Sequence, residues 1–214
     1  MDTARSAILG VLLAGGRSER MGGGDKCLEP LAGRPLLAHA VERLRPQVGA
    51  LVLNANGDPE RFARFALLVV PDTLTGFPGP LAGILAGMLW AQKHAPEVRL
   101  VATAATDTPF FPLDLVARLL ARTGDGNEIA IARSGGRDYP VFGLFPVGLA
   151  EDLSAFLGQS RNLAVMAWID RQKSRAVDFP TPEKGAIDPF LNINTPEDLT
   201  EAEAIIRDGT LHKL

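Results

Sequence analysis

Hydrophobic residues follow two different patterns along the first 120 residues of the chain, continuous apolar runs and helical spacing. Four continuous apolar runs predict strands buried on both faces of a parallel sheet. These runs cover residues 7–13, 50–53, 67–70 and 100–105. Segments with apolar residues at helical spacing separate them and predict helices over 35–44, 81–92 and 112–122. The alternation therefore predicts an α/β fold, with a mostly parallel sheet, helices on both of its faces and right-handed connections.

The pattern is less regular after residue 125. Short apolar runs at 128–132 and 141–145 predict two strands joined by a hairpin turn around 134–138, and a further strand is predicted at 175–179. Helices are predicted over 148–157, 163–171 and 196–206. Thr195 is the expected N-cap of the last helix, whose first turn carries Glu197 and Asp198. The chain contains no linker or repeat, so we expect a single domain over residues 1–214.

Composition excludes several classes of protein. The 214 residues are 46% hydrophobic and 22% charged, which is typical of a globular protein. A net charge of −3 with 6% aromatic residues argues against a nucleic-acid-binding surface. No apolar run approaches the roughly 20 residues that cross a membrane. Cys27 is the single cysteine, which leaves no internal disulfide, so we expect a cytoplasmic protein with neither nucleic acid nor membrane as a partner.

The first apolar run ends in a glycine-rich segment with three cations. Residues 13–26 read Leu-Ala-Gly-Gly-Arg-Ser-Glu-Arg-Met-Gly-Gly-Gly-Asp-Lys. Glycines let backbone N–H groups approach an anion closely, and Arg17, Arg20 and Lys26 supply positive charge. The segment matches neither the Walker pattern, because Cys27 follows Lys26, nor the dinucleotide pattern Gly-x-Gly-x-x-Gly. It therefore predicts a polyphosphate-binding loop of another type.

Polar residues follow the other predicted parallel strands at their carboxyl ends. Asn54, Asp72 and Asp107 each stand one or two residues beyond an apolar run. Ligands of open parallel sheets bind outside this edge, so these side chains are expected to converge with the glycine-rich loop. The Asp107 carboxylate can hold a hard cation against phosphate oxygens. Asp72 can accept hydrogen bonds from the ring N–H and exocyclic amine of guanine, a donor pair that adenine lacks.

Motifs in a fixed order then resemble one family. They are Leu-Ala-Gly-Gly at 13–16, Ser-x-Arg-Met-Gly at 18–22, Asp-Lys at 25–26, Gly-Pro-Leu-Ala-Gly-Ile at 79–84, Thr-Asp-Thr-Pro-Phe at 106–110, and Asn-Ile-Asn-Thr-Pro-Glu-Asp-Leu at 192–199. This series resembles the nucleotide-dependent nucleotidyltransferases and, among them, the molybdenum cofactor guanylyltransferases. The chain departs from the family at Tyr139-Pro140, where His-Pro is common, so no histidine role is carried over.

The resemblance implies a Rossmann-like three-layer α/β/α fold, with nucleotide binding in the N-terminal half and acceptor binding in the C-terminal half. It implies transfer of GMP from GTP to the terminal phosphate of molybdopterin, with release of pyrophosphate and with Mg²⁺ held by Asp107. The implied catalytic residues are Lys26, Arg20 and Asp107. The implied nucleotide-binding residues are Leu13, Ala14, Gly15, Gly16, Lys26, Asn54, Asp72 and Asp107, and the acceptor-binding ones are Gly79, Pro80, Asn192 and Asn194. Molybdopterin-handling proteins and molybdoenzyme chaperones are the implied protein partners.

Alternatives remain open at this stage. Asp107 could cap a helix, Asp72 could be a turn residue, and the asparagines at 192 and 194 could form an Asx-type cap. The Gly79-Pro80 entry could serve helix packing alone. Alternative functions are a cytidylyltransferase or sugar-phosphate nucleotidyltransferase of the same fold, a non-catalytic GTP- or pterin-binding module, and a dinucleotide-dependent oxidoreductase.

Overall fold

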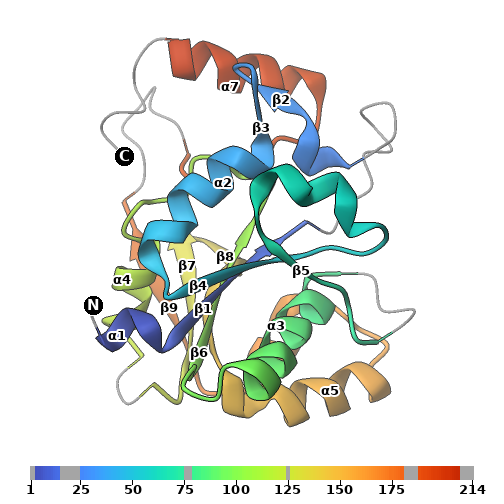
Figure 1. The fold of residues 1–214 in the computed structure, drawn as a ribbon. Helices are drawn as coiled ribbons and strands as arrows, with labels where there is room; N and C mark the ends of the chain where they lie inside the picture. The colour runs from blue at the N-terminus through green and yellow to red at the C-terminus, as the bar shows by residue number, and fades with distance from the viewer. Residues whose placement is uncertain (1–2, 15–24, 75–78, 124–125, 181–187, 208–214) are drawn as a thin grey trace.

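A computed structural model describes residues 3–14, 25–74, 79–123, 126–180 and 188–207 (Figure 1). Within these residues the core is a seven-stranded sheet of order β5-β4-β1-β6-β8-β7-β9. Its strands are β1 (Ile8–Leu13), β4 (Ala50–Asn54), β5 (Leu68–Val70), β6 (Leu100–Ala105), β7 (Ile129–Ser134), β8 (Arg137–Pro146) and β9 (Ser174–Phe179). Only β8 runs antiparallel to its neighbours, so the mostly parallel sheet is confirmed.

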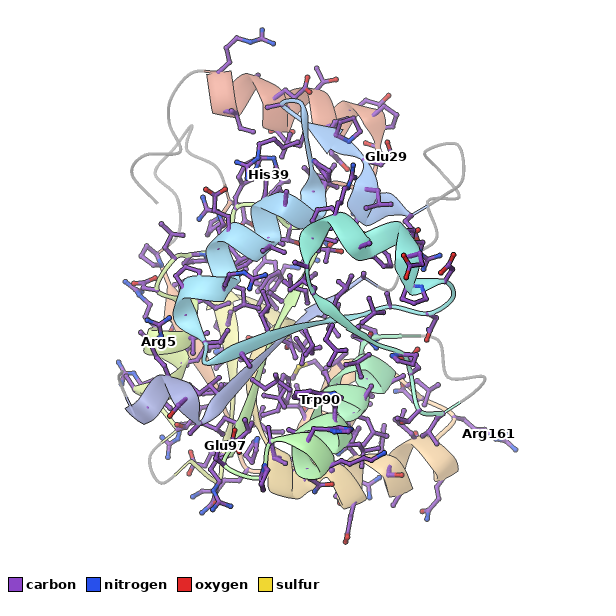
Figure 2. The ribbon with its side chains drawn as sticks, in the orientation of Figure 1. Arg5, Glu29, His39, Trp90, Glu97 and Arg161 are labelled. Atoms are coloured by element: carbon purple, nitrogen blue, oxygen red, sulfur yellow. The ribbon has the colours of Figure 1, made fainter. Side chains whose placement is uncertain are left out.

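Helices cover both faces of this sheet, which confirms the three-layer α/β/α arrangement (Figure 1). On one face α3 (Pro80–His94), α5 (Ala150–Gln159) and α6 (Val165–Ile169) pack through one apolar cluster. On the other face α2 (Leu36–Leu44) and α4 (Leu115–Leu120) pack through a second. His39 of α2 and Trp90 of α3 mark the two sides in Figure 2.

A small third cluster ties the last helix to an early hairpin. Strands β2 (Pro30–Leu31) and β3 (Arg34–Pro35) form the hairpin, and helix α7 (Pro196–Arg207) lies beside it at the top of Figure 1. The buried residues of this cluster are Leu31, Leu36, Phe110, Ile193 and Ala202. Apolar contacts in this cluster thus hold the early hairpin, residue 110 and the last helix together.

The predicted elements of the main sheet and its covering helices are confirmed, with changed boundaries. The β7–β8 turn is only Gly135-Gly136, with φ of 56° and 77°, because two residues at positive φ match the strand twist. Helix α6 is shorter than predicted because the Asn162 side chain accepts from Ala164 N in a turn that precedes it. The helix expected from residue 112 begins at Leu115.

The elements that were not predicted are α1 (Thr3–Ser6), the β2–β3 hairpin, and the 3₁₀ segments η1 (Lys26–Leu28), η2 (Arg45–Gln47), η3 (Pro59–Phe65) and η4 (Val147–Leu149). All are too short for a periodic apolar pattern. In the described part of the chain, the helices lack the length and apolar character needed to span a membrane.

Candidate active site

A pocket of about 530 Å³ opens at the carboxyl ends of β1, β4, β5 and β6. Strand β1 lies between β4 and β6, and the chain winds outward from it in both directions, which is where ligands bind in doubly wound sheets. The residues that line the pocket come from the four strand ends, from α3, from the segment that begins at Lys26, from β8 and from the segment around residue 192. They include Leu13, Ala14, Lys26, Asn54, Asn56, Asp72, Gly79, Pro80, Thr106, Asp107 and Asn192.

At one end of the pocket, Lys26 joins a carboxylate to an amide. Its Nζ lies 2.7 Å from Asp107 Oδ2 and also donates to Asn194 Oδ1. The Lys26 side chain is 12% exposed and that of Asp107 is 26% exposed, so the ion pair is accessible from the pocket but shielded from bulk water. The attraction between the two charges is therefore stronger than it would be on the open surface.

The segment 192–198 is fixed beside this ion pair by its own hydrogen bonds. Ile193 N donates to the Asp107 carbonyl at 2.8 Å, and Thr108 Oγ1 is hydrogen-bonded to Asn192 Oδ1. Asp198 Oδ2 accepts from the backbone N–H groups of residues 194 and 195, while Asp198 N donates to Thr195 Oγ1. This reciprocal cap confirms Thr195 as the N-cap of α7, and it also holds the backbone of Asn194 in place.

These backbone donors keep the pKa of Asp198 below its usual range, with the Asn194 N–H as the main cause. The carboxylate therefore stays charged, and the cap stays formed, at all pH values near neutrality.

At the other end of the pocket, two asparagines hold Asp72. Asn54 Nδ2 donates to Asp72 Oδ1 at 2.9 Å and to the Val70 carbonyl at 3.0 Å. Asn56 exchanges two hydrogen bonds with Asp72: its Nδ2 donates to Oδ2 at 2.8 Å, and its Oδ1 accepts from Asp72 N at 2.9 Å. Each carboxylate oxygen of Asp72 thus has one partner and a further lone pair for a ligand.

Helix α3 approaches this network very closely at Gly83. A Cβ built at Gly83 would lie 2.3 Å from Asn54 Oδ1 and 2.6 Å from Leu13 Cδ2. The helix begins at Pro80, with Gly79 as N-cap at a φ of 136°, a backbone conformation that favours glycine. The Gly79-Pro80-Leu81-Ala82-Gly83 motif therefore serves both the helix entry and the close contact with Asn54.

The backbone at the end of β1 is engaged in the sheet. Ala14 N donates to the Asn54 carbonyl at 3.0 Å, and the Leu13 carbonyl accepts from Thr106 N and from Thr106 Oγ1. These bonds align the ends of β1, β4 and β6 at the base of the pocket. Cys27 is buried beside them, and burial raises the pKa of its thiol to about 12, so it is no nucleophile at neutral pH.

Tyr139 anchors the approach to the 192–198 segment from the side of β8. Its hydroxyl donates to Asp188 Oδ2 at 2.8 Å, and its ring stacks on Phe190 with centroids 4.6 Å apart. Burial and the adjacent Asp188 carboxylate raise the pKa of Tyr139 to about 12. Tyr139 therefore stays protonated and acts as a hydrogen-bond donor.

The structure brings most of the predicted site residues into one place. Leu13, Ala14, Lys26, Asn54, Asp72, Gly79, Pro80, Asp107 and Asn192 line the pocket, and Asn194 contacts it through Lys26. Gly15, Gly16, Arg17 and Arg20 lie outside the described residues.

Sequence reasoning missed Asn56 and the second role of Asp198. Asn56 follows Asn54 by two residues, so in an extended chain both side chains point the same way, and this spacing was an available signal.

With this geometry in view, the comparisons with known proteins are consistent with one another. Residues 10–176 match the family model described as MobA-like NTP transferase domain. A molybdenum cofactor guanylyltransferase of Bradyrhizobium sp. (strain ORS 278) is 50% identical over 205 residues, which are 95% of this chain and 95% of that protein. Another from Mesorhizobium japonicum is 47% identical over 207 residues, 96% of this chain and 99% of that protein.

Solved structures share the fold. Molybdopterin-guanine dinucleotide biosynthesis protein A of Archaeoglobus fulgidus superposes with a TM-score of 0.71 at 24% identity, covering 94% of this chain and 99% of that one. Rv0371c of Mycobacterium tuberculosis, solved in complex with manganese, gives a TM-score of 0.66 at 18% identity, covering 92% of this chain and 98% of that one.

Proposed function

The chain belongs to the MobA-like NTP transferase family, and we propose that it transfers GMP from GTP to the terminal phosphate of molybdopterin, releasing pyrophosphate and forming the guanine dinucleotide cofactor. The observation that carries the proposal is that one pocket has a carboxylate at each end. Asp72 is held by two asparagines at one end, and Asp107 is paired with Lys26 at the other.

The Asp72 end is suited to guanine. Guanine presents two adjacent donors, and the two oxygens of Asp72 each retain a lone pair after bonding to Asn54 and Asn56. Both hydrogens of the Asn54 amide are used, one toward Val70 and one toward Asp72. Asp72 is thus the proposed base reader, that is, the carboxylate that accepts hydrogen bonds from guanine, and Asn54 positions it. Leu13, Ala14, Gly15 and Gly16 are the proposed backbone wall of the nucleotide site.

The Lys26 end is suited to the triphosphate. The Lys26 ammonium is held between Asp107 and Asn194, where it can neutralise phosphate charge and the charge that develops as pyrophosphate leaves. Removal of one such cation typically lowers the rate by about 10²–10³-fold. Arg20 is proposed to assist from the glycine-rich loop. Its role remains a prediction of the sequence.

The oxygen donors around Asp107 suit a hard divalent cation. Asp107 offers a carboxylate, with the amide oxygens of Asn192 and Asn194 nearby, and the described residues contain no cluster of three His, Cys, Asp or Glu side chains. Mg²⁺ is commonly held by one or two carboxylates together with substrate phosphates and water. When bound there, Mg²⁺ would neutralise and orient phosphate oxygens. We therefore assign the metal site to Asp107.

Acceptor binding is proposed for Gly79, Pro80, Asn192 and Asn194. Asn192 lines the pocket next to Asp107, so a phosphate approaching from that side would meet an amide and the Lys26 ammonium. The acceptor phosphate is ionised at pH 7, so no general base is required, and positioning is the main catalytic device. The cytoplasmic location and the molybdoenzyme chaperones as partners remain predictions of the sequence.

The test is pyrophosphate release with each of the four NTPs and Mg²⁺, with and without molybdopterin, for the wild type and Asp107→Ala. The proposal expects release with GTP only, dependent on molybdopterin and lost in the variant. Release with CTP or with a sugar phosphate would overturn the substrate assignment. Tight GTP binding without release under any condition would indicate a binding module instead.

A further inference from the structure

We infer that Arg61 is a positioning residue that connects the base-reading end of the pocket to the phosphate-binding end, an inference that rests on the function proposed above. Arg61 belongs to η3, which follows β4 and precedes β5. It does not line the pocket, so any effect on the reaction must pass through the residues that it contacts.

One guanidinium group makes two separate contacts. Arg61 Nε lies 3.0 Å from Asp25 Oδ2, and Nη2 donates to the Asn56 carbonyl. The planar, multi-donor guanidinium can serve both acceptors at once, whereas a lysine ammonium is a compact point charge. The group also lies 4.8 Å from the centroid of the Phe62 ring, which limits its freedom.

The two acceptors lead to opposite ends of the pocket. Asp25 directly precedes Lys26 and accepts Leu28 N through its carbonyl at 2.9 Å, so it fixes the turn that carries Lys26. Asn56 exchanges its two side-chain hydrogen bonds with Asp72. Arg61 is thus linked through Asp25 to Lys26, the proposed phosphate-binding cation. It is linked through Asn56 to Asp72, the proposed guanine-binding carboxylate.

The turn at Gly57 supports the same reading. Gly57 has a φ of 87°, and a Cβ built there would lie 3.3 Å from Arg61 Nη1. Glycine at this position therefore lets the chain reverse while the guanidinium approaches the Asn56 carbonyl.

Arg64 on the same segment provides a matched control. Its guanidinium also lies over a neighbouring ring, 4.9 Å from the Phe65 centroid, and it forms no ion pair with any residue that the structure describes. Replacing either arginine removes one exposed cation and one ring contact from η3. Only Arg61→Ala also removes the connection between Asp25 and Asn56.

The experiment compares Arg61→Ala, Arg64→Ala, Asp25→Asn and Asn56→Ala. The measurements are kcat and KM for GTP and for ITP, which lacks the 2-amino group, at saturating molybdopterin, with GTP binding by calorimetry. We expect Asp25→Asn to lower kcat with little change in the preference for GTP over ITP. Asn56→Ala should lower that preference with a smaller effect on kcat. Arg61→Ala should do both, lowering kcat/KM for GTP by about 10–100-fold, since small misplacements of reacting groups cost up to about 10²-fold.

The inference is overturned if Arg61→Ala matches Arg64→Ala in kcat and in GTP preference, or if it affects only one of the two. Should Arg61→Ala fail to fold, Arg61→Lys is measured instead. Because the lysine keeps a cation beside Asp25, Arg61→Lys should retain more of the wild-type kcat than of the wild-type preference for GTP over ITP. Equal losses of both, or no loss of either, contradict the inference. Failure of the proposed function is distinct, because the wild type itself would then release no pyrophosphate from GTP.

Discussion

Replacing Gly83 by alanine tests whether the close approach of α3 keeps the base-reading network in place. The added methyl group would meet Asn54 Oδ1 at 2.3 Å, a separation that a real Cβ does not adopt. Asn54 has little freedom to give way, because its amide donates to Val70 and to Asp72. Either Asn54 rotates and releases Asp72, or α3 moves outward.

Gly87, one turn further along α3, is the matched control. A Cβ built there would lie 2.6 Å from Val11 Cγ2, so Gly87→Ala also overpacks α3 against β1, but away from Asn54. Overpacking costs about 1–3 kcal/mol, and alanine regains about 1 kcal/mol of helix propensity. The net loss of roughly 0–2 kcal/mol corresponds to a Tm decrease of up to about 8 °C for a domain of this size.

The two variants should differ in ligand binding. In addition, Gly83→Ala should lower the affinity for GTP by about 10–100-fold, because hydrogen bonds to a charged group such as Asp72 contribute about 1.5–3 kcal/mol. Scanning calorimetry gives the Tm, and titration calorimetry with GTP gives the affinity. If Gly83→Ala binds GTP as tightly as Gly87→Ala does, then the close approach of α3 is not what holds Asn54 and Asp72 in the conformation that binds GTP.

Three further predictions follow from charges and burial. Lys26→Met should lower turnover by about 10²–10³-fold. It should also raise the affinity of the nucleotide-free protein for Mn²⁺, measured by EPR titration, because the ammonium 2.7 Å from Asp107 is removed. An unchanged Mn²⁺ affinity would contradict this prediction. Arg175 and Lys173 contact Glu128 and hold its pKa at about 2, so its stabilising effect is complete above the unfolded pKa of about 4.3 and is lost as the pH falls toward 2. In urea unfolding, the free energy of unfolding of the wild type should therefore approach that of Glu128→Gln as the pH falls from about 4.3 toward 2. A difference between the two proteins that stays constant over this pH range would refute the pairing. Cys27 should react with iodoacetamide at pH 8 only after unfolding, as mass spectrometry would show, since burial raises its pKa to about 12.

The sequence was sufficient wherever a strand delivers a residue to the sheet edge. Asp107 and Asn54 follow continuous apolar runs, and parallel strands bring such positions together without further information. Thr195 was likewise recognisable as an N-cap, because its hydroxyl and the carboxylate three residues later form a local pattern.

Contacts between irregular segments could not be predicted in this way. Arg61 reaches Asp25 and Asn56 from a seven-residue 3₁₀ segment that has no apolar period, so neither its conformation nor its direction is encoded by spacing. The approach of Gly83 to Asn54 depends on the depth at which α3 packs on the sheet. Such distances arise from tertiary packing and not from local propensity.

The contact between Lys26 and Asn194 also has a consequence during synthesis. The two residues are 168 positions apart, and at about 5–20 residues per second a ribosome needs roughly 8–34 s to make the intervening chain. Once Asp72 has been made, the nascent chain carries Asn54 and Asp72, yet Lys26 still lacks the Asn194 amide and α7 has not joined the hairpin. With the residue roles proposed above, we expect a chain that ends before residue 190 to bind guanine nucleotides but to release no pyrophosphate, so that synthesis of the last segment would complete the active site.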